Sequence, residues 1–471
     1  MVASSCASLM EGTAARFTTG AGLGGVAALA GRSSVPARTG KSRRARIRGI
    51  VSVVDEEAYN SQMDSDSRRD FLRKTSSGAL AMTAASYARV MGANERIHLG
   101  LIGAGDRGNH VMSLFQNKPQ VQVVAICDVY GQRLEATRQK APGSAGFGDY
   151  RKLLEAKPLD AVLVATPDHW HSRIAIAALN AGKDVYCEKP LTRTIEEGPQ
   201  IVKAARENNR ICQVGMQQRS AKHYREAKEK YFETGKLGAI TLARTWWYGN
   251  AWHLRKAPPE LQTQPRDLDW AGFVGPINWR DYDPQQFYNW RAYLDYGGGQ
   301  VTDLFTHWID VVHMFTGKEI PCAASAAGGV YVYRDGRTAP DTINVLLEYP
   351  EPKPFTATFE ATLVPGIKGE AIEMCGTEGR LWIDRSRYEF YPVGAKEPSE
   401  VVKAEVIEGV RDSLTQDHVN NFLDCVKSRA KPNGDVLIGH RSAQASHLGN
   451  ISYEQKRRIP FDTTREEILP L

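Results

Sequence analysis

The sequence predicts an α/β protein in which a doubly wound parallel sheet is followed by an α+β domain with a large, open, mostly antiparallel sheet. Three observations predict this fold class. Apolar runs alternate with helix-like segments between residues 97 and 214, which is the order of elements in a parallel sheet. A glycine-rich turn follows the first apolar run. Beyond about residue 218, strand-like segments succeed one another mostly without helices between them, which favours antiparallel pairing.

The glycine-rich turn is the strongest local signal in the chain. The apolar run 97–102 ends in Gly103-x-Gly105-x-x-Gly108, a helix-like segment follows, and a second apolar run closes on Asp128. This is the order of parts in a dinucleotide-binding Rossmann unit. The first glycine permits the tight turn, the second lets the backbone approach a pyrophosphate, and the third allows close packing of helix and strand. The simpler alternative is a glycine-rich turn that binds nothing.

Asp128 bears on the choice of dinucleotide. At the end of the second strand its carboxylate can accept hydrogen bonds from both ribose hydroxyls, and its charge would repel a 2′-phosphate. We therefore expect NAD, while the nearby Arg107 and Arg133 leave NADP possible.

We expect three regions: a leader at 1–94, an NAD-binding domain at 95–217, and a substrate and oligomerisation domain at 218–471. Further strands of the first domain are expected at 160–165, 184–187 and 211–214. Those of the second domain are expected at 241–248, 342–349, 355–362, 371–375 and 381–383, with closing helices at 416–428 and 441–453. An open sheet has a free face, so a homo-dimer or homo-tetramer formed through it is expected.

Composition excludes several function classes. The chain of 471 residues has a net charge of +6, and much of that charge comes from the first fifty residues, so it does not indicate nucleic-acid binding. The 7 cysteines are scattered without a C-x-x-C pair, which argues against a disulfide framework and a zinc site. No stretch reaches the ~18–20 apolar residues of a membrane span, so no stable membrane insertion is expected.

The leader carries a possible export signal. Residues 67–74 read Ser-Arg-Arg-Asp-Phe-Leu-Arg-Lys and precede a mildly apolar stretch, which resembles a twin-arginine signal. Met63 lies just before this motif and is an alternative start to Met1. The signal predicts an exported, periplasmic protein; if it is a basic solvated tail instead, the protein stays in the cytoplasm.

Four motifs together resemble the Gfo/Idh/MocA superfamily of oxidoreductases (glucose–fructose oxidoreductase and inositol 2-dehydrogenase), from about residue 96 to the C-terminus. They are the glycine-rich turn, Thr166-Pro167-Asp168-x-x-His171, Glu188-Lys189-Pro190, and Gly297-Gly298-Gly299-x-x-x-Asp303-x-x-x-His307-x-x-Asp310. One departure is Asp168, where many relatives carry Asn. The resemblance implies that Lys189, Asp303 and His307 are catalytic and contact a carbohydrate substrate.

The same three residues make chemical sense without the resemblance. Lys189 follows a parallel strand, where doubly wound folds present ligands, and an ammonium there can stabilise a developing alkoxide. Asp303 and His307 are four apart, so a helix would place them on one face, and an imidazole can take the proton from a hydroxyl. The alternative is a capping carboxylate and a core histidine. His313 and Asp310 could add metal ligands beside His307, but three such residues on one helix diverge in direction, so no metal is expected.

Other residues are candidates for ligand contact. Trp247 lies in an aromatic stretch that could stack on a sugar ring, although clustered aromatics are more often core. The predicted cofactor contacts are Gly103, Gly105, Arg107, Gly108, Asp128, Thr166, Pro167, His171, Glu188, Lys189, Gln217 and Arg291.

Three functions are compatible with these features. The first is an NAD(P)-dependent oxidoreductase that acts on a secondary hydroxyl of a sugar, glycoside or polyol. The second is a glycoside hydrolase or lyase that uses bound NAD transiently. The third is a nucleotide-binding module without turnover. An exported enzyme meets little free NAD, so the sequence predicts a tightly held cofactor that is regenerated within the site.

Overall fold

The computed structural model describes residues 96–410 and 412–470. The predicted leader, including the twin-arginine motif, lies outside the described residues. No helix within the described ranges is both long enough and apolar enough to cross a bilayer.

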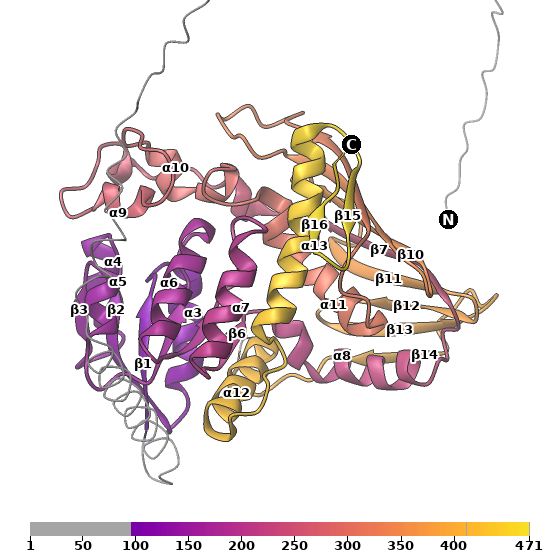
Figure 1. Cartoon of the computed structure of the whole chain (residues 1–471), viewed down its shortest axis with the longest axis horizontal. Helices are drawn as coiled ribbons and strands as arrows, with labels where there is room; N and C mark the ends of the chain where they lie inside the picture. The colour runs from indigo at the N-terminus through magenta and orange to yellow at the C-terminus, as the bar shows by residue number, and fades with distance from the viewer. Residues whose placement is uncertain (1–95, 411, 471) are drawn as a thin grey trace, which may run out of the picture. The chain divides into compact units, whose positions relative to one another are not determined.

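The first sheet has six parallel strands in the order β3-β2-β1-β4-β5-β6 (Figure 1). Its strands are β1 (Ile97–Ile102), β2 (Val121–Cys127), β3 (Ala145–Phe147), β4 (Ala161–Val164), β5 (Asp184–Cys187) and β6 (Cys212–Val214). The helices between them are α3 (Asp106–Gln116), α4 (Gly131–Arg138), α5 (Tyr150–Leu154), α6 (Asp168–Asn180) and α7 (Glu197–Glu207). Every residue of β4 and β5 is buried, as expected for strands covered on both faces. The doubly wound sheet is therefore confirmed.

The second sheet has ten strands in the order β14-β13-β12-β11-β7-β10-β9-β8-β15-β16. They are β7 (Ile240–Tyr248), β8 (Ala323–Gly329), β9 (Thr342–Tyr349), β10 (Phe355–Thr362), β11 (Glu370–Gly376), β12 (Gly379–Ile383), β13 (Arg387–Pro392), β14 (Glu400–Lys403), β15 (Ile459–Asp462) and β16 (Glu467–Ile468). All neighbours pair antiparallel except β7 and β10, which are parallel. The mostly antiparallel second sheet is confirmed.

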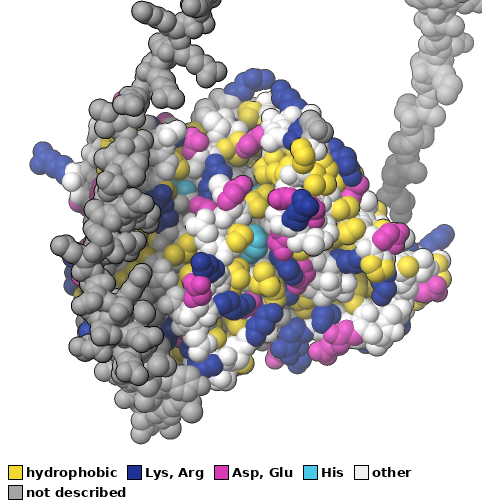
Figure 2. Space-filling model, in the orientation of Figure 1, with side chains coloured by type: hydrophobic (Ala, Val, Ile, Leu, Met, Phe, Trp, Pro, Cys, Tyr) yellow, Lys and Arg dark blue, Asp and Glu magenta, His cyan; other side chains and the backbone are white. Residues whose placement is uncertain are grey.

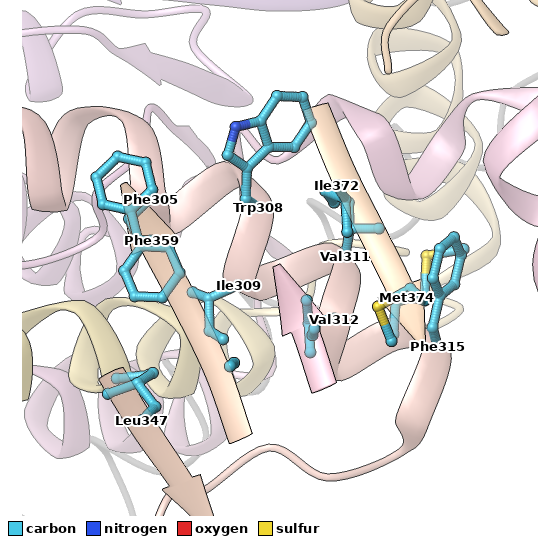
Figure 3. Close-up of a cluster of buried hydrophobic side chains, with 14 of the residues drawn as sticks. Phe305, Trp308, Ile309, Val311, Val312, Phe315, Leu347, Phe359, Ile372 and Met374 are labelled. Atoms are coloured by element: carbon cyan, nitrogen blue, oxygen red, sulfur yellow. The ribbon is translucent and has the colours of Figure 1, made fainter. Parts of the chain in front are cut away.

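Helices cover one face of the second sheet and build the main core there. α11 (Thr306–Thr316) and α13 (Val436–Gln455) lie against it, and Figure 3 shows Ile309 and Val312 of α11 among strand residues such as Phe359 and Ile372. Phe305 stacks on Phe359 with ring centroids 4.8 Å apart. A π-helical turn, η6 (Val301–Phe305), precedes α11 and carries Asp303.

Shorter helices join the two sheets. η1 (Gln217–Ser220), α8 (Lys222–Ala227) and η2 (Lys228–Glu233) follow β6. α12 (Ser413–Ser428) returns to the first sheet, where Phe422 packs edge-on against Phe115 and Tyr186. These contacts join the C-terminal part of the chain to the first sheet.

Residues 250–296, here called the cover segment, fold over the end of the first sheet (Figure 1). The segment contains η3 (Ala251–Leu254), η4 (Pro259–Leu261), α9 (Trp270–Val274), α10 (Pro284–Tyr288) and η5 (Trp290–Ala292). It has its own small core around Trp270, Phe273 and Phe287. The amide of Asp269 donates to the carbonyl of Val129 just beyond β2, at 2.9 Å. No element of this segment is among those that the sequence predicts.

The surface carries charges of both signs. Figure 2 shows Lys and Arg interspersed with Asp and Glu among apolar side chains over the described residues of this face. A mixed surface of this kind gives no electrostatic footprint for a nucleic acid on this face.

Candidate active site

A cavity of about 990 Å³ lies at the carboxyl ends of the strands of the first sheet, the place where doubly wound folds present ligands. The cover segment, the β12–β13 turn and the η6–α11 helix also line it. Every predicted site residue lines the cavity except Gly108. The topology therefore brings together candidates that are far apart in the chain.

The glycine-rich turn has the backbone geometry of a phosphate cradle. Gly103 has φ +96°, and a Cβ there would lie 2.6 Å from the backbone of Ala165. A Cβ on Gly108 would lie 2.0 Å from the carbonyl oxygen of Gly103, so this glycine allows α3 to pack closely on the turn. At Gly105 a Cβ would meet nothing within 4 Å, which leaves open space where a pyrophosphate fits. These residues fit a dinucleotide.

Asp128 faces the glycine-rich turn. Its carboxylate accepts hydrogen bonds from the amides of Ala104, at 2.7 Å, and Tyr130, at 2.9 Å. Burial raises its pKa, which the charge of Arg133 and the two amides oppose. The guanidinium of Arg133 lies 4.6 Å from the ring of Phe287 in the cover segment. The arrangement fits a ribose and does not separate NAD from NADP.

Arg107 and Glu188 meet across the cavity. The Arg107 Nε donates to Glu188 Oε1 at 2.8 Å, and the Glu188 side chain is almost fully buried. The guanidinium of Arg107 also lies 3.9 Å from Asp412, at the start of α12. The pair joins the glycine-rich turn to the segment that carries Lys189.

The predicted cofactor contacts after β4 and β6 divide into two kinds. Thr166 Oγ1 and Gln217 Oε1 are buried without a hydrogen-bond partner among the described residues, so each has a free polar group at the cavity. Pro167 lines the cavity beside Thr166. His171 differs, because its ring nitrogens lie 2.7 Å from the carbonyl oxygen of Pro190 and 2.9 Å from that of Thr166. This ring bridges the backbone just beyond β4 and the backbone directly after Lys189, and its predicted direct contact with the cofactor stays a prediction.

Lys189 and Asp303 form an ion pair in the cavity. The part of the cavity around Lys189, Asp303 and His307 is here called the substrate end. The Lys189 ammonium donates to Asp303 Oδ1 at 2.6 Å and also to the carbonyl oxygen of the same residue. Burial opposes ionisation of Asp303, but the charges of Lys189 and Arg291 and the hydrogen bond to His253 hold its pKa well below the usual range. Arg291 Nε lies 3.5 Å from Asp303 Oδ1. Asp303 is therefore a carboxylate that fixes a charged lysine.

His307 lies in the same cavity as a neutral imidazole. Its side chain is buried, and its Nδ1 has no hydrogen-bond partner among the described residues. Burial and the charges of Lys189 and Arg385 hold its pKa well below the ordinary value. The ring of Trp247 lies 6.5 Å from that of His307, centroid to centroid, and 5.4 Å from that of Trp308. An unprotonated histidine at this position can accept a proton.

Three lining or supporting residues were missed as site residues. His253 Nε2 lies 2.9 Å from Asp303 Oδ2, and Arg385 lies 4.7 Å from the Trp247 ring centroid. Asp168 is buried in the first turn of α6 and lines the cavity. Only Asp168 had a signal in the sequence, as the departure from Asn in its motif.

The remaining acid and histidine of the α11 motif have other partners. Arg219 Nε donates to both carboxylate oxygens of Asp310 at 2.8 Å. His313 Nε2 lies 2.7 Å from the hydroxyl of Tyr349. These contacts assign the two side chains to the core of the second domain.

Two family models and several known proteins are similar to parts of this chain. Residues 97–216 match the family model described as "Oxidoreductase family, NAD-binding Rossmann fold", and residues 275–382 match the model "GFO/IDH/MocA C-terminal domain". An inositol 2-dehydrogenase of Salmonella typhimurium is 33% identical over 142 residues, which cover 30% of this chain and 42% of that protein. A glycosyl hydrolase family 109 protein of Solibacter usitatus is 31% identical over 172 residues, which cover 32% and 39% of the two chains.

Solved structures show the same fold at lower identity. A levoglucosan dehydrogenase in complex with NADH has a TM-score of 0.61 and 18% identity, covering 78% of this chain and 99% of that chain. By sequence, this chain spans less than half the length of the inositol 2-dehydrogenase that it matches. The two family models match the regions that contribute the glycine-rich turn, Lys189, Asp303 and His307. Residues 97–216 and 275–382 therefore belong to the NAD-binding and C-terminal domains of the Gfo/Idh/MocA oxidoreductase superfamily.

Proposed function

We propose that the protein is an NAD-dependent oxidoreductase that acts on a secondary hydroxyl of a sugar, glycoside or polyol. The observation that carries the proposal is a single cavity that contains a dinucleotide cradle, the Lys189–Asp303 pair and a neutral His307. The names of the relatives support the substrate class, since they include an inositol 2-dehydrogenase and a levoglucosan dehydrogenase.

The roles follow from the charges. Bound NAD supplies the hydride acceptor for the carbon that carries the reacting hydroxyl. Lys189 is held by Asp303 and donates a hydrogen bond to the substrate oxygen, which stabilises negative charge as the hydride leaves. His307 takes the hydroxyl proton because its imidazole is unprotonated. Trp247 lies beside His307 and offers a ring face for the apolar side of a sugar.

A second candidate is a glycoside hydrolase or lyase in which NAD is reduced and reoxidised within one turnover. The cover segment favours it. Arg255 Nη1 donates to Asp106 in the first turn of α3 at 2.9 Å, and Nη2 donates to the hydroxyl of Tyr288. Arg255 and Tyr288 both line the cavity, so the contact closes its rim beside the glycine-rich turn. A covered cofactor exchanges slowly, and a slowly exchanging cofactor is best regenerated in place. The glycosyl hydrolase family 109 relative also supports this candidate.

The two candidates are separated by the fate of the nucleotide. The purified protein is analysed for bound NAD and then mixed with inositols, free sugars and glycosides in separate reactions. Stoichiometric release of NADH on mixing supports the dehydrogenase. Transient reduction of bound nicotinamide without release supports the redox cycle. Failure of every sugar and polyol to reduce added or bound NAD contradicts both.

We propose that the twin-arginine motif exports the protein to the periplasm. The motif is a sequence feature, and it is tested by replacing Arg68 and Arg69 with Lys and following a fused reporter. Loss of export in the Lys variant is the expected result, and equal export by both proteins contradicts the proposal.

We also propose a homo-dimer or homo-tetramer formed through the second sheet. Trp246, Ala371 and Trp382 form a buried cluster apart from the main core of that sheet. Val401 pairs across from Glu389, the partner of Trp382, so it lies on the same face of the sheet, where it is exposed. Light scattering measures the assembly, and Val401→Lys is expected to dissociate it. A monomeric wild-type protein contradicts this proposal.

A further inference from the structure

Asp168 is a carboxyl group without a partner in the substrate end of the cavity. It is 4% exposed and lines the cavity, yet its side chain accepts no hydrogen bond from the described residues. A carboxylate that serves only to hold structure normally accepts hydrogen bonds when it is buried. Asp303 shows the contrast, because its two oxygens are bonded to Lys189 and His253.

The surroundings of Asp168 place it among the reacting groups. Its charge interacts with those of Asp303, Lys189, Arg291 and Arg193. A Cβ on Gly297 would lie 3.0 Å from Asp168 Oδ2, so the glycine leaves the carboxyl room at this position. Burial and the charge of Asp303 raise the pKa of Asp168 to about 7. At neutral pH the group therefore exists in both protonated and ionised forms, which suits a proton carrier.

Oxidation of an alcohol does not need this group. One proton leaves the hydroxyl. His307 accepts that proton, and Lys189, held by Asp303, stabilises the oxygen that loses it. A second proton acceptor is needed when the new carbonyl acidifies the hydrogen on the adjacent carbon. In a glycoside, removal of that proton can expel a leaving group one carbon further on.

We propose that Asp168 is a second catalytic base that removes the proton from the carbon adjacent to the newly formed carbonyl of a glycoside. The inference rests on the proposed function and commits it to glycosides. The C–H electron pair becomes the carbon–carbon double bond of an enone, the bond to the aglycone oxygen breaks, and the aglycone leaves as an alcohol after taking a proton. The Asp168 carboxylic acid formed in the step is a proton source for that oxygen.

The test follows hydride transfer and bond cleavage separately in one reaction. A panel of para-nitrophenyl glycosides is added to protein with bound NAD, and reduced nicotinamide and nitrophenolate are recorded together. The wild type is expected to do both. Water then adds across the double bond of the enone, with its oxygen at the carbon that lost the aglycone and a solvent proton at the adjacent carbon, so in heavy water the hydrated sugar is expected to carry deuterium at that adjacent carbon. Asp168→Asn keeps the shape of the side chain and cannot take a proton. It is expected to reduce nicotinamide within a few-fold of wild type and to release nitrophenolate about a hundredfold more slowly or worse.

Controls separate the other readings. Asp424→Asn removes a carboxylate from the exposed face of α12 and is expected to behave as wild type. Equal loss of both steps in Asp168→Asn would make Asp168 a positioning residue and overturn the proposal, as would loss of bound NAD or unchanged nitrophenolate release. Reduction of nicotinamide by wild type with neither nitrophenolate release nor deuterium uptake overturns the proposal but leaves the dehydrogenase intact. If no sugar reduces NAD, the proposed function itself fails.

Discussion

The Lys189 ammonium donates to both the carboxylate and the backbone carbonyl of Asp303, although the two residues are 114 positions apart. Lys189 follows β5 of the first sheet, and Asp303 lies on η6 in the second domain. Both side chains are largely shielded from water. The pair therefore joins the two halves of the chain at the point where the chemistry is proposed.

Removal of the lysine leaves Asp303 without its nearest cation. Lys189→Met is expected to lower the rate of nicotinamide reduction by on the order of a hundredfold or more, because a donor to the developing alkoxide is lost. It is also expected to destabilise the fold by about 3 kcal/mol, because breaking a buried pair strands a charge. Single-turnover kinetics and denaturant unfolding measure the two effects. A Lys189→Met variant with wild-type turnover would contradict the catalytic role of Lys189 and favour the hypothesis of a nucleotide-binding module without turnover.

The low pKa of His307 decides how the rate of hydride transfer depends on pH on the acid side. Since burial and Lys189 hold its pKa well below 6.5, it remains unprotonated as the pH falls through the ordinary histidine range. The rate of hydride transfer by the wild type is therefore expected to show no fall near pH 6.5 that is caused by protonation of His307. His307→Gln is expected to be slower than wild type by on the order of a hundredfold at every pH measured. A wild-type acid limb centred on the ordinary histidine value and absent in the variant would contradict this assignment.

Asp168 makes stability depend on pH in the opposite sense to a salt-bridged carboxylate. Its pKa rises from 3.8 to about 7 on folding, so the folded state binds the proton more tightly than the unfolded chain. The stabilisation of the folded state by this tighter proton binding is fully present below about pH 4 and is lost as the pH rises through about 7. Asp168→Asn is therefore expected to gain up to about 4 kcal/mol relative to wild type at pH 8, and little at pH 4. Urea unfolding of both proteins at equal nucleotide content tests this, and a difference that does not change with pH contradicts it.

The Arg255–Asp106 contact is expected to slow cofactor release. It joins the cover segment to α3 beside the glycine-rich turn, and the ion pair is partly exposed. A partly exposed pair contributes about 1 kcal/mol or less, so Arg255→Ala is expected to speed release of NAD by up to roughly fivefold. Arg458→Ala removes a comparable pair with Glu348 on the second sheet and serves as the control. Equal release rates in both variants would show that the contact does not retain the cofactor.

Much of the first domain could be predicted from the sequence because its signals are local. A buried strand, a glycine turn and a following helix are visible within thirty residues, and the structure has them at β1, Gly103–Gly108 and α3. Strands β9 and β10 alternate buried and partly exposed positions, so the two-residue alternation that predicts a strand could also be seen in their sequence.

The missed elements lack such local signals. β8 is rich in Ala and Gly and gains its place only by pairing with β9 and β15. The cover segment consists of short helical turns that are held by tertiary contacts with the first sheet. His253 and Arg385 enter the site through the same kind of contact, since their partners Asp303 and Trp247 are distant in the chain. Tertiary packing decides such positions, and no spacing rule reveals them.

The most direct measurement is the nicotinamide content and near-ultraviolet absorbance of the purified protein before and after a panel of sugars, polyols and glycosides is added. A protein that contains or takes up NAD, and whose nicotinamide becomes reduced with at least one of these compounds, is the predicted result. Gly105→Val, which fills the open space of the cradle, is expected to abolish both uptake and reduction. A wild-type protein that takes up no nucleotide even after incubation with NAD would contradict the assignment of the cavity.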